Sequence, residues 1–233
     1  MTSILIVALA FAQQTKPAVT AEMRGDISMA RKDYRQAIDF YKQMEPLSHI
    51  ALNKIGIGYH QLLDLPSAKK YYERALKSKP DYAEAVNNLG TVFYAGKSYR
   101  RAITQYTKAL RLTPNSASIY SNLGTAWFAR KNYERASLAY QKALELDPEV
   151  FEHRSTNGVL LQERSITERA KFHFYLAKTY AKAGQVERAL LYMRKALEEG
   201  FKERQKFVEE PEFAALQENP EFQELLKLQP RVL

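Results

Sequence analysis

Histidine, cysteine and carboxylate side chains are the usual metal ligands and catalytic groups of proteins. This 233-residue sequence places few of them at spacings that would form a metal site or a catalytic group. Cysteine is absent, which excludes disulfides, thiolate metal sites and a cysteine nucleophile. The histidines are His49, His60, His153 and His173, and no two of them have a metal-ligand spacing such as i, i+4 on one helix. We therefore expect no metal site and no cofactor.

Catalytic patterns are equally scarce. The sequence shows no nucleophile–base signature, and no paired carboxylates fall on a common face of the groove described below. The Gly56-Ile57-Gly58 segment has neither the full spacing of a phosphate-binding loop nor a preceding strand. We predict that the protein is not an enzyme, and we look instead at the elements that its side chains build.

Residue types recur every 34 positions through the middle of the chain. Six columns share this spacing over three copies: Pro80, Pro114 and Pro148; Gly56, Gly90 and Gly124; Ala68, Ala102 and Ala136; Tyr72, Tyr106 and Tyr140; Ala75, Ala109 and Ala143; and Leu76, Leu110 and Leu144. A period of this length is typical of a solenoid of stacked supersecondary units.

One central unit shows how the pattern predicts two packed helices. Large apolar residues such as Phe93 and Tyr106 follow helical intervals, and Pro114 ends the second helix because the residue before a proline is pushed out of the helical region. Gly90 on the first helix and Ala102 on the second are predicted to lie where the two backbones approach closely.

The pattern resembles the tetratricopeptide repeat, in which each unit is a helical hairpin. Counted from residues 49, 83 and 117, the family's seventh and eighth positions are Ile55-Gly56, Leu89-Gly90 and Leu123-Gly124, and its eleventh is Tyr59, Phe93 and Trp127. The resemblance implies an all-α fold, a right-handed superhelical solenoid of antiparallel helix pairs. It assigns three units to residues 49–82, 83–116 and 117–150.

Weaker copies and a tail flank these three units. A degenerate first unit is predicted at 18–48, where Gly25 and Tyr41 hold the small and aromatic positions, and a degenerate fifth at 170–203. Residues 151–165 are predicted to be an inserted surface loop, either a spacer or a binding element. Residues 204–233 repeat Pro-Glu-Phe and are predicted to form C-terminal capping helices.

In this family the first helices line a concave groove that holds extended peptides or partner helices. The resemblance places there Asn53, Asn87, Asn88, Thr91, Tyr94, Ser121, Asn122, Thr125 and Phe128, together with Lys54 and His60. Because an amide carries donors and an acceptor, Asn88 and Asn122 are predicted to grip a peptide backbone. Tyr94 and Phe128 are predicted to be apolar anchors. The alternative is that these side chains are simply solvated.

The first residues are predicted to be a signal peptide and not part of the fold. Residues 4–12 are apolar but too few to cross a bilayer of about 30 Å at about 1.5 Å per residue. Ala10-Phe11-Ala12 supplies the small residues that signal peptidase needs, so cleavage is expected after Ala12, which makes residues 1–12 the signal. We expect a periplasmic or secreted protein without a transmembrane span. If the segment is instead a first helix, the protein is cytoplasmic.

Charge leaves three function classes to weigh. Of the net charge of +9, residues 1–194 contribute +12 and residues 195–233 contribute −3. The preferred interpretation is a scaffold or adaptor that binds a protein or peptide partner, whose identity the sequence does not reveal. The alternatives are a nonspecific binder of anionic surfaces or nucleic acid through basic helices, and a non-catalytic regulatory subunit of an envelope enzyme. No specific nucleic-acid partner is expected. The tail resembles the ends of many bacterial tetratricopeptide proteins, which favours a bacterial source.

Overall fold

The computed structural model describes residues 19–151 and 165–228, and these are helical throughout their regular structure. The predicted signal peptide and nearly all of the predicted insertion lie outside the described residues. In chain order the helices are α1 (Ala21–Ala30), α2 (Tyr34–Lys42), α3 (His49–Gln61), α4 (Leu65–Ser78), α5 (Ala83–Ala95), α6 (Tyr99–Leu112), α7 (Ala117–Ala129), α8 (Tyr133–Leu146), α9 (Ile166–Lys182), α10 (Val186–Glu198), α11 (Lys206–Glu209), the 3-10 helix η2 (Pro211–Leu216) and α12 (Pro220–Lys227).

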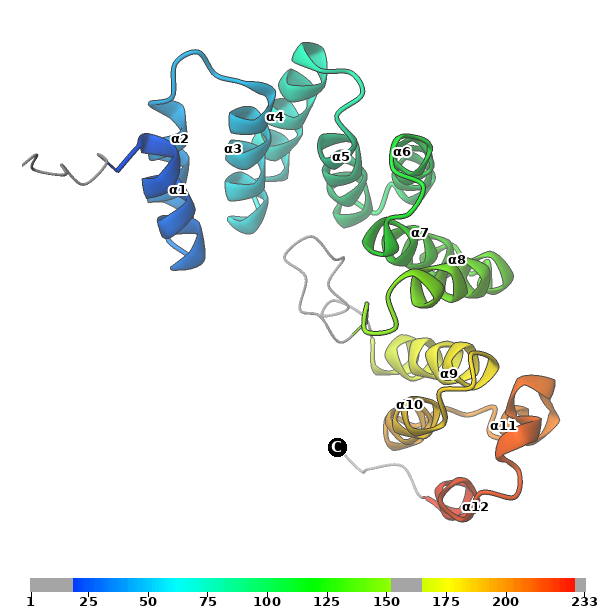
Figure 1. Ribbon diagram of the computed structural model, residues 1–233. Helices are drawn as coiled ribbons and strands as arrows, with labels where there is room; N and C mark the ends of the chain where they lie inside the picture. The colour runs from blue at the N-terminus through cyan, green and yellow to red at the C-terminus, as the bar shows by residue number, and fades with distance from the viewer. Residues whose placement is uncertain (1–18, 152–164, 229–233) are drawn as a thin grey trace, which may run out of the picture.

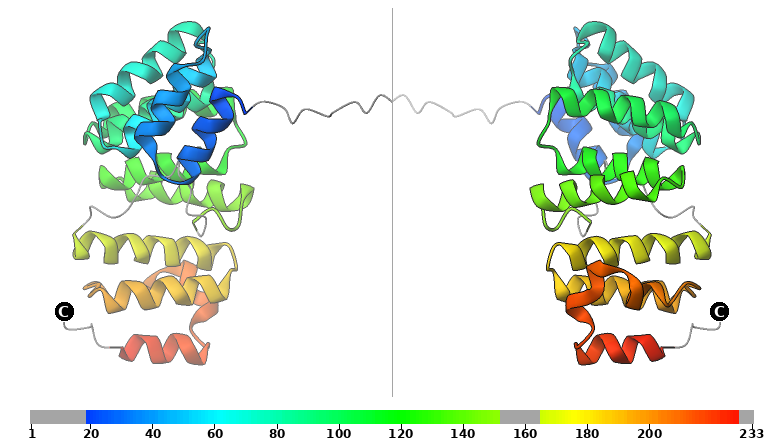
Figure 2. Two further views of the ribbon diagram at one scale, coloured as in Figure 1. Left: turned by 90° about the vertical axis from the view of Figure 1, so that its left-hand side faces the viewer. Right: turned by 90° about the vertical axis from the view of Figure 1, so that its right-hand side faces the viewer.

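Consecutive helices pair and stack into a curved array, with α3, α5 and α7 on its inner side and α4, α6 and α8 on its outer side (Figure 1). Turned views show α9, α10 and α12 as further layers at the C-terminal end (Figure 2). The predicted all-α solenoid of helix pairs is confirmed.

Each helical hairpin turns through one residue in the left-handed region. These residues are Lys32, Leu63, Lys97, Lys131 and Gly184, with φ of 62°, 61°, 56°, 59° and 71°. At such a position the chain leaves the first helix and its N–H groups satisfy the last carbonyls, as the N–H of Ser98 does by donating to the carbonyl of Phe93 at 2.8 Å. Four of the five turns therefore place a side chain where glycine is the favoured residue.

The recurring glycines pack against tyrosine rings, which corrects the prediction that Gly90 meets Ala102. A Cβ at Gly90 would lie 2.7 Å from Cε1 of Tyr106, and equally short contacts would join Gly56 to Tyr72 and Gly124 to Tyr140. The glycine and tyrosine are 16 residues apart in every case, including Gly25 and Tyr41. The glycine column therefore makes room for an aromatic ring and not for a second backbone.

A phenylalanine cluster closes the C-terminal end of the array. Its members are Phe174, Phe201, Phe207, Phe213 and Phe222, all buried, with neighbouring ring centroids 4.5–6.3 Å apart. Lys178 on α9 also forms ion pairs with Glu210 and Glu212 of the tail. The tail thus covers apolar surface that the last repeat would otherwise leave open to water.

Candidate functional site

A polar ladder connects the first helices along the inner side of the array. Its members sit at the sixth position of each unit and reach back to the preceding unit. On α3, the Lys54 ammonium pairs with Glu22 at 2.8 Å and Asp26 at 2.7 Å on α1. On α5, Nδ2 of Asn88 donates to Oδ1 of Asn53 at 3.1 Å.

The ladder continues to α7, where Nδ2 of Asn122 donates to Oδ1 of Asn87 at 3.1 Å. Within α5, Nδ2 of Asn87 donates to Oδ1 of Asn88 at 3.4 Å, so the amides of three helices are linked. All four are buried, with Asn122 1% and Asn88 7% exposed. This corrects the prediction that Asn88 and Asn122 present their amides to a peptide backbone, because these groups instead join neighbouring units.

The two predicted threonines, Thr91 and Thr125, form hydrogen bonds with the recurring tyrosines. Oγ1 of Thr91 accepts a hydrogen bond from Oη of Tyr106 at 3.3 Å, and Oγ1 of Thr125 accepts one from Tyr140 at the same distance. Thr125 in turn donates to the backbone carbonyl of Ser121 at 2.9 Å. A buried tyrosine hydroxyl needs such a partner, so both threonines belong to the packing of their own unit.

The two predicted aromatic anchors have different surroundings. Phe128 is 4% exposed, and its ring lies 5.2 Å from that of Tyr133 and 5.4 Å from that of Phe172. It belongs to the core between the fourth and fifth units, which corrects the prediction that it anchors a partner. Tyr94 is partly exposed at the end of α5, with its ring 5.3 Å from that of Tyr99.

The accessible side chains of the inner face are mainly apolar or uncharged. Ile50 is 43% exposed, and Ile57 and His60 follow it on α3 as half-buried residues. Burial lowers the pKa of His60, so its imidazole is neutral at pH 7. Together with Tyr94 on α5, these residues form what we call the inner strip. Tyr94 and His60 were predicted to line the groove, whereas Ile50 and Ile57 were not, and the predicted Ser121 is half-buried on α7.

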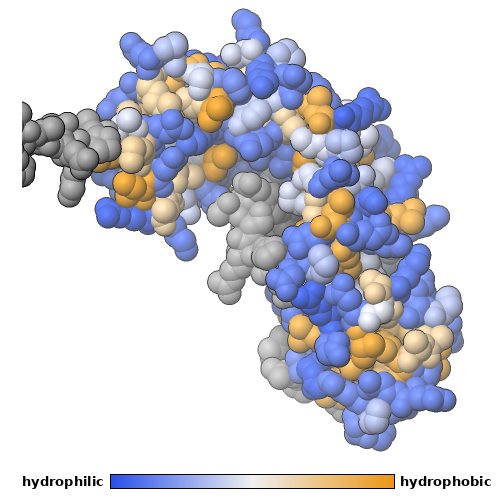
Figure 3. All heavy atoms as spheres, viewed as in Figure 1, coloured by the Kyte–Doolittle hydropathy of each residue, from blue (hydrophilic) through white to orange (hydrophobic). Residues whose placement is uncertain are grey.

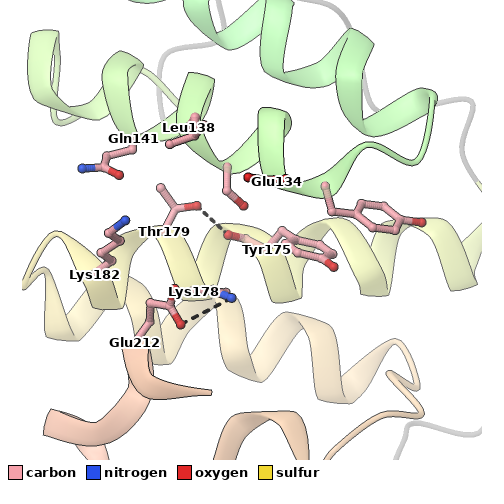
Figure 4. A pocket seen from close by; sticks show the side chains of 10 residues that line it. Glu134, Leu138, Gln141, Tyr175, Lys178, Thr179, Lys182 and Glu212 are labelled. Carbon is pink, nitrogen blue, oxygen red and sulfur yellow. Dashed lines mark hydrogen bonds and ion pairs between the residues drawn. The ribbon is translucent and has the colours of Figure 1, made fainter. Parts of the chain in front are cut away.

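A pocket of about 300 Å³ lies elsewhere, between α8 and α9, and was not predicted (Figure 4). It is lined by Tyr133, Glu134, Ser137, Leu138, Gln141, Tyr175, Lys178, Thr179, Lys182 and Glu212. The sequence held one signal for it: Ser137 follows Ile103 by 34 residues, so a small polar residue replaces a large apolar one.

No metal-binding group of three or more His, Cys, Asp or Glu side chains occurs in the part of the chain that the structure describes. Across residues 19–151 and 165–228, every helix is too short or too polar to cross a membrane. The surface seen in Figure 3 is mostly hydrophilic, with apolar residues scattered in small groups.

Comparison with known families agrees with the geometry of the helix pairs. Residues 51–82 and 117–150 match models of the tetratricopeptide repeat, and residues 90–128 match a further model of this repeat. The chain therefore contains tetratricopeptide repeats.

Solved structures of MamA resemble about three quarters of the chain. One crystal structure of MamA has a TM-score of 0.52 at 22% identity, covering 75% of this chain and 93% of that one. Residues 41 to the end of MamA from Desulfovibrio magneticus RS-1 give 0.52 at 23% identity, covering 75% and 89%. At this identity the likeness establishes the fold alone. No curated protein matches the sequence significantly.

Proposed function

We propose that the protein is a non-catalytic scaffold that binds an extended peptide or a helix of a partner protein on its inner face. Proteins built from tetratricopeptide repeats act as interaction scaffolds as a class. The observation that carries the proposal is the inner strip, in which Ile50, Ile57, His60 and Tyr94 are accessible beside a fully paired polar ladder.

This arrangement makes apolar contact, and not hydrogen bonding by the ladder amides, the expected source of affinity for a partner. The ladder amides stay inside the stack, so affinity comes from apolar contact with Ile50, Ile57 and Tyr94 and from the neutral imidazole of His60. Such binding depends little on salt, because few charges are neutralised. A partner segment with two or three apolar side chains fits this surface best.

The test begins with capture of partners from the native envelope fraction, followed by calorimetry on the purified pair. Ile57→Glu and Tyr94→Ala should each weaken binding about tenfold or more, since truncated interface anchors cost roughly 2 kcal/mol. The matched control is Lys108→Gln, an exposed cation on the outer helix α6, which should leave the affinity unchanged. Equal affinity in all three variants would refute the inner strip as the site.

The basic outer helices support a second candidate, binding of an anionic surface. Helix α6 carries Arg100, Arg101, Lys108 and Arg111 and no acidic residue. Among the described residues none of these four has a carboxylate partner, although Arg101 lies 3.9 Å from the centroid of the Phe93 ring. Binding through this surface would fall steeply as salt rises, which separates it from binding at the inner strip.

We also propose that the protein is exported from a bacterial cell. The support is the apolar run of residues 4–12 followed by a small-residue cleavage signal, both in the part of the chain outside the described residues. Export would place the inner strip in contact with envelope or extracellular partners.

A further inference from the structure

The pocket between α8 and α9 is a trough with two helical walls (Figure 4). One wall is Glu134, Ser137, Leu138 and Gln141, and the other is Tyr175, Lys178, Thr179 and Lys182. Each set has the spacing i, i+3, i+4, i+7, so each is one continuous face of its helix. Glu212 of η2 also lines the trough, beside Lys178 of α9 (Figure 4).

The trough coincides with a short side chain at a position where the earlier outer helices carry longer ones, Ile38, Lys69 and Ile103. At the junction of α2 with α3, Ile38 fills this position, and a Cβ at Gly58 would lie 2.6 Å from its Cγ1 atom. Ile103 is buried at the corresponding position of α6. Ser137 occupies the same position on α8, and its short side chain leaves the junction unfilled.

The apolar surface of the trough comes from Leu138 and from the rings of Tyr133 and Tyr175, beside the hydroxyls of Ser137 and Thr179. The rings of Tyr133 and Tyr175 stack at one side, with centroids 4.7 Å apart and planes 13° from parallel. Leu138 is 59% exposed at the rim. A partner's apolar side chain would remove both the tyrosine faces and the leucine from water.

One lysine of the trough, Lys178, forms ion pairs within the protein. Lys178 pairs with Glu210 and Glu212, and although burial alone would lower its pKa, the hydrogen bonds and charges of these two carboxylates raise it. This ammonium ties α9 to the tail and has no unpaired charge to offer a ligand.

Two other charged groups of the trough are unpaired within the described chain, Glu134 on α8 and Lys182 on α9. Lys182 lies beside Gln141 at one end, and Glu134 lies nearer the other (Figure 4). Seven residues of α-helix separate Glu134 from Gln141, which is roughly 10 Å along the axis at 1.5 Å per residue. The trough therefore presents a carboxylate and an ammonium at different places along its length, with Leu138 and Tyr175 in the same lining.

We propose that this trough is a second docking site, distinct from the inner strip, for an extended segment of a partner protein. The segment has a basic residue that pairs with Glu134, an apolar side chain over Leu138 and Tyr175, and an acidic residue that reaches Lys182. Alternate side chains of an extended chain share a face, so the three residues stand at positions i, i+2 and i+4 of the segment and span about 13 Å at about 3.3 Å per residue. This is close to the rise of about 10 Å along α8 from Glu134 to Gln141, and the long basic and acidic side chains take up the difference. The volume suits so short a segment.

The experiment uses the full ¹⁵N-labelled chain and two synthetic heptapeptides, acetyl-Gly-Arg-Gly-Leu-Gly-Glu-Gly-amide, whose three side chains share one face when extended, and its neutral analogue with glutamine at both charged positions. The charged peptide should shift amide resonances of α8 and α9 around the trough, and should bind about three- to tenfold more tightly than the neutral one, as expected for two exposed ion pairs. No shift at the trough with about 5 mM peptide, near the weakest affinity that is still specific, overturns the proposal.

Substitutions test the same site from the protein side. Ser137→Ile should fill the trough and abolish peptide binding, whereas Thr104→Ile, at an exposed site on α6, should bind normally. Glu134→Gln and Lys182→Gln should each weaken binding about two- to fivefold and leave the fold intact, which keeps the test valid if the isoleucine variant does not fold. Unchanged binding in both charge variants, or in folded Ser137→Ile, overturns the proposal. Tyr94→Ala at the inner strip should have no effect on these peptides.

Discussion

Gly90 lies against the ring of Tyr106 so closely that a Cβ at position 90 would be 2.7 Å from Cε1 of the ring and 3.2 Å from Cβ of Gln105. The ring cannot move aside, because Tyr106 is fully buried and its hydroxyl donates to Thr91. This contact fixes the distance between α5 and α6.

Gly90→Ala should lower the free energy of unfolding by about 1–3 kcal/mol, because the added methyl group collides with a buried ring. Gly96→Ala is the matched control: position 96 has φ −77°, and a Cβ there would meet nothing closer than 3.5 Å. That variant should be neutral or gain up to about 1 kcal/mol. Urea denaturation measures both, and equal stability of the two variants would contradict the assigned contact.

Asn122→Ala should destabilise the fold by about 1–3 kcal/mol, because it removes the donor to Asn87 and leaves a buried amide oxygen without that bond. Asn115→Ala, in the exposed connection between α6 and α7, should stay within about 0.5 kcal/mol of the parent protein. If thermal midpoints show no difference between these variants, the ladder does not stabilise the stack.

Leu63→Gly should stabilise the protein by about 0.5–1 kcal/mol, because Leu63 has φ 61° and is 79% exposed, so glycine relieves strain and loses little packing. Its neighbour Leu62 has φ −81°, and Leu62→Gly should instead cost about 0.5–1 kcal/mol. Chemical denaturation of both variants gives the sign of each change in the free energy of unfolding. Two changes of the same sign would show that backbone conformation does not decide the outcome.

Acidification should destabilise the fold partly through His60. Burial lowers the pKa of His60 in the folded protein, whereas the unfolded chain keeps the ordinary value near 6.5. Below about pH 6.5 the unfolded state therefore binds the proton first, and the free energy of unfolding falls as pH decreases towards the folded pKa. His60→Gln should show a smaller loss between pH 7.5 and 5. His173, whose pKa burial also lowers, remains in both proteins and cancels in the comparison.

Export predicts a mature chain that starts at Gln13. Amino-terminal sequencing of protein made in its native host should find Gln13-Gln14 at the start, in the periplasmic or secreted fraction. A soluble cytoplasmic product that retains Met1 would exclude a cleaved signal.

The helix pairs could be predicted from the sequence because their determinants are local and recur. The 34-residue columns contain the small residues, the large apolar residues and the helix-ending prolines, so the pairing of α5 with α6 followed from a single unit. The partner of Gly90 could not be assigned in the same way. Ala102 and Tyr106 both face α5, and only side-chain reach decides that the tyrosine ring, not the alanine backbone, fills the space beside the glycine.

The site was harder to predict because it depends on contacts between units. The spacing correctly put Asn88 and Asn122 in the same column, but it could not reveal that each amide donates to an acceptor on the first helix of the preceding unit. Phe128 was misjudged for a similar reason, since its partner Phe172 lies beyond the insertion and outside the regular period. The trough lies beside a short side chain, that of Ser137. This serine becomes informative only when it is compared with the longer Ile38 and Ile103 at the same position of other units.

Some contacts in the array lie within one unit and others join neighbouring units, and this division allows a central unit to be duplicated. The glycine–tyrosine contact closes within one unit, whereas the bonds from Asn88 to Asn53 and from Asn122 to Asn87 cross to the neighbouring unit. The unit 83–116 carries a backward donor, Asn88, and a forward acceptor, Asn87. A second copy of this unit, inserted after residue 116, would find a partner for both amides, so the scaffold can be lengthened in whole modules. The unit 49–82 is less portable, because Lys54 must follow a helix that supplies carboxylates.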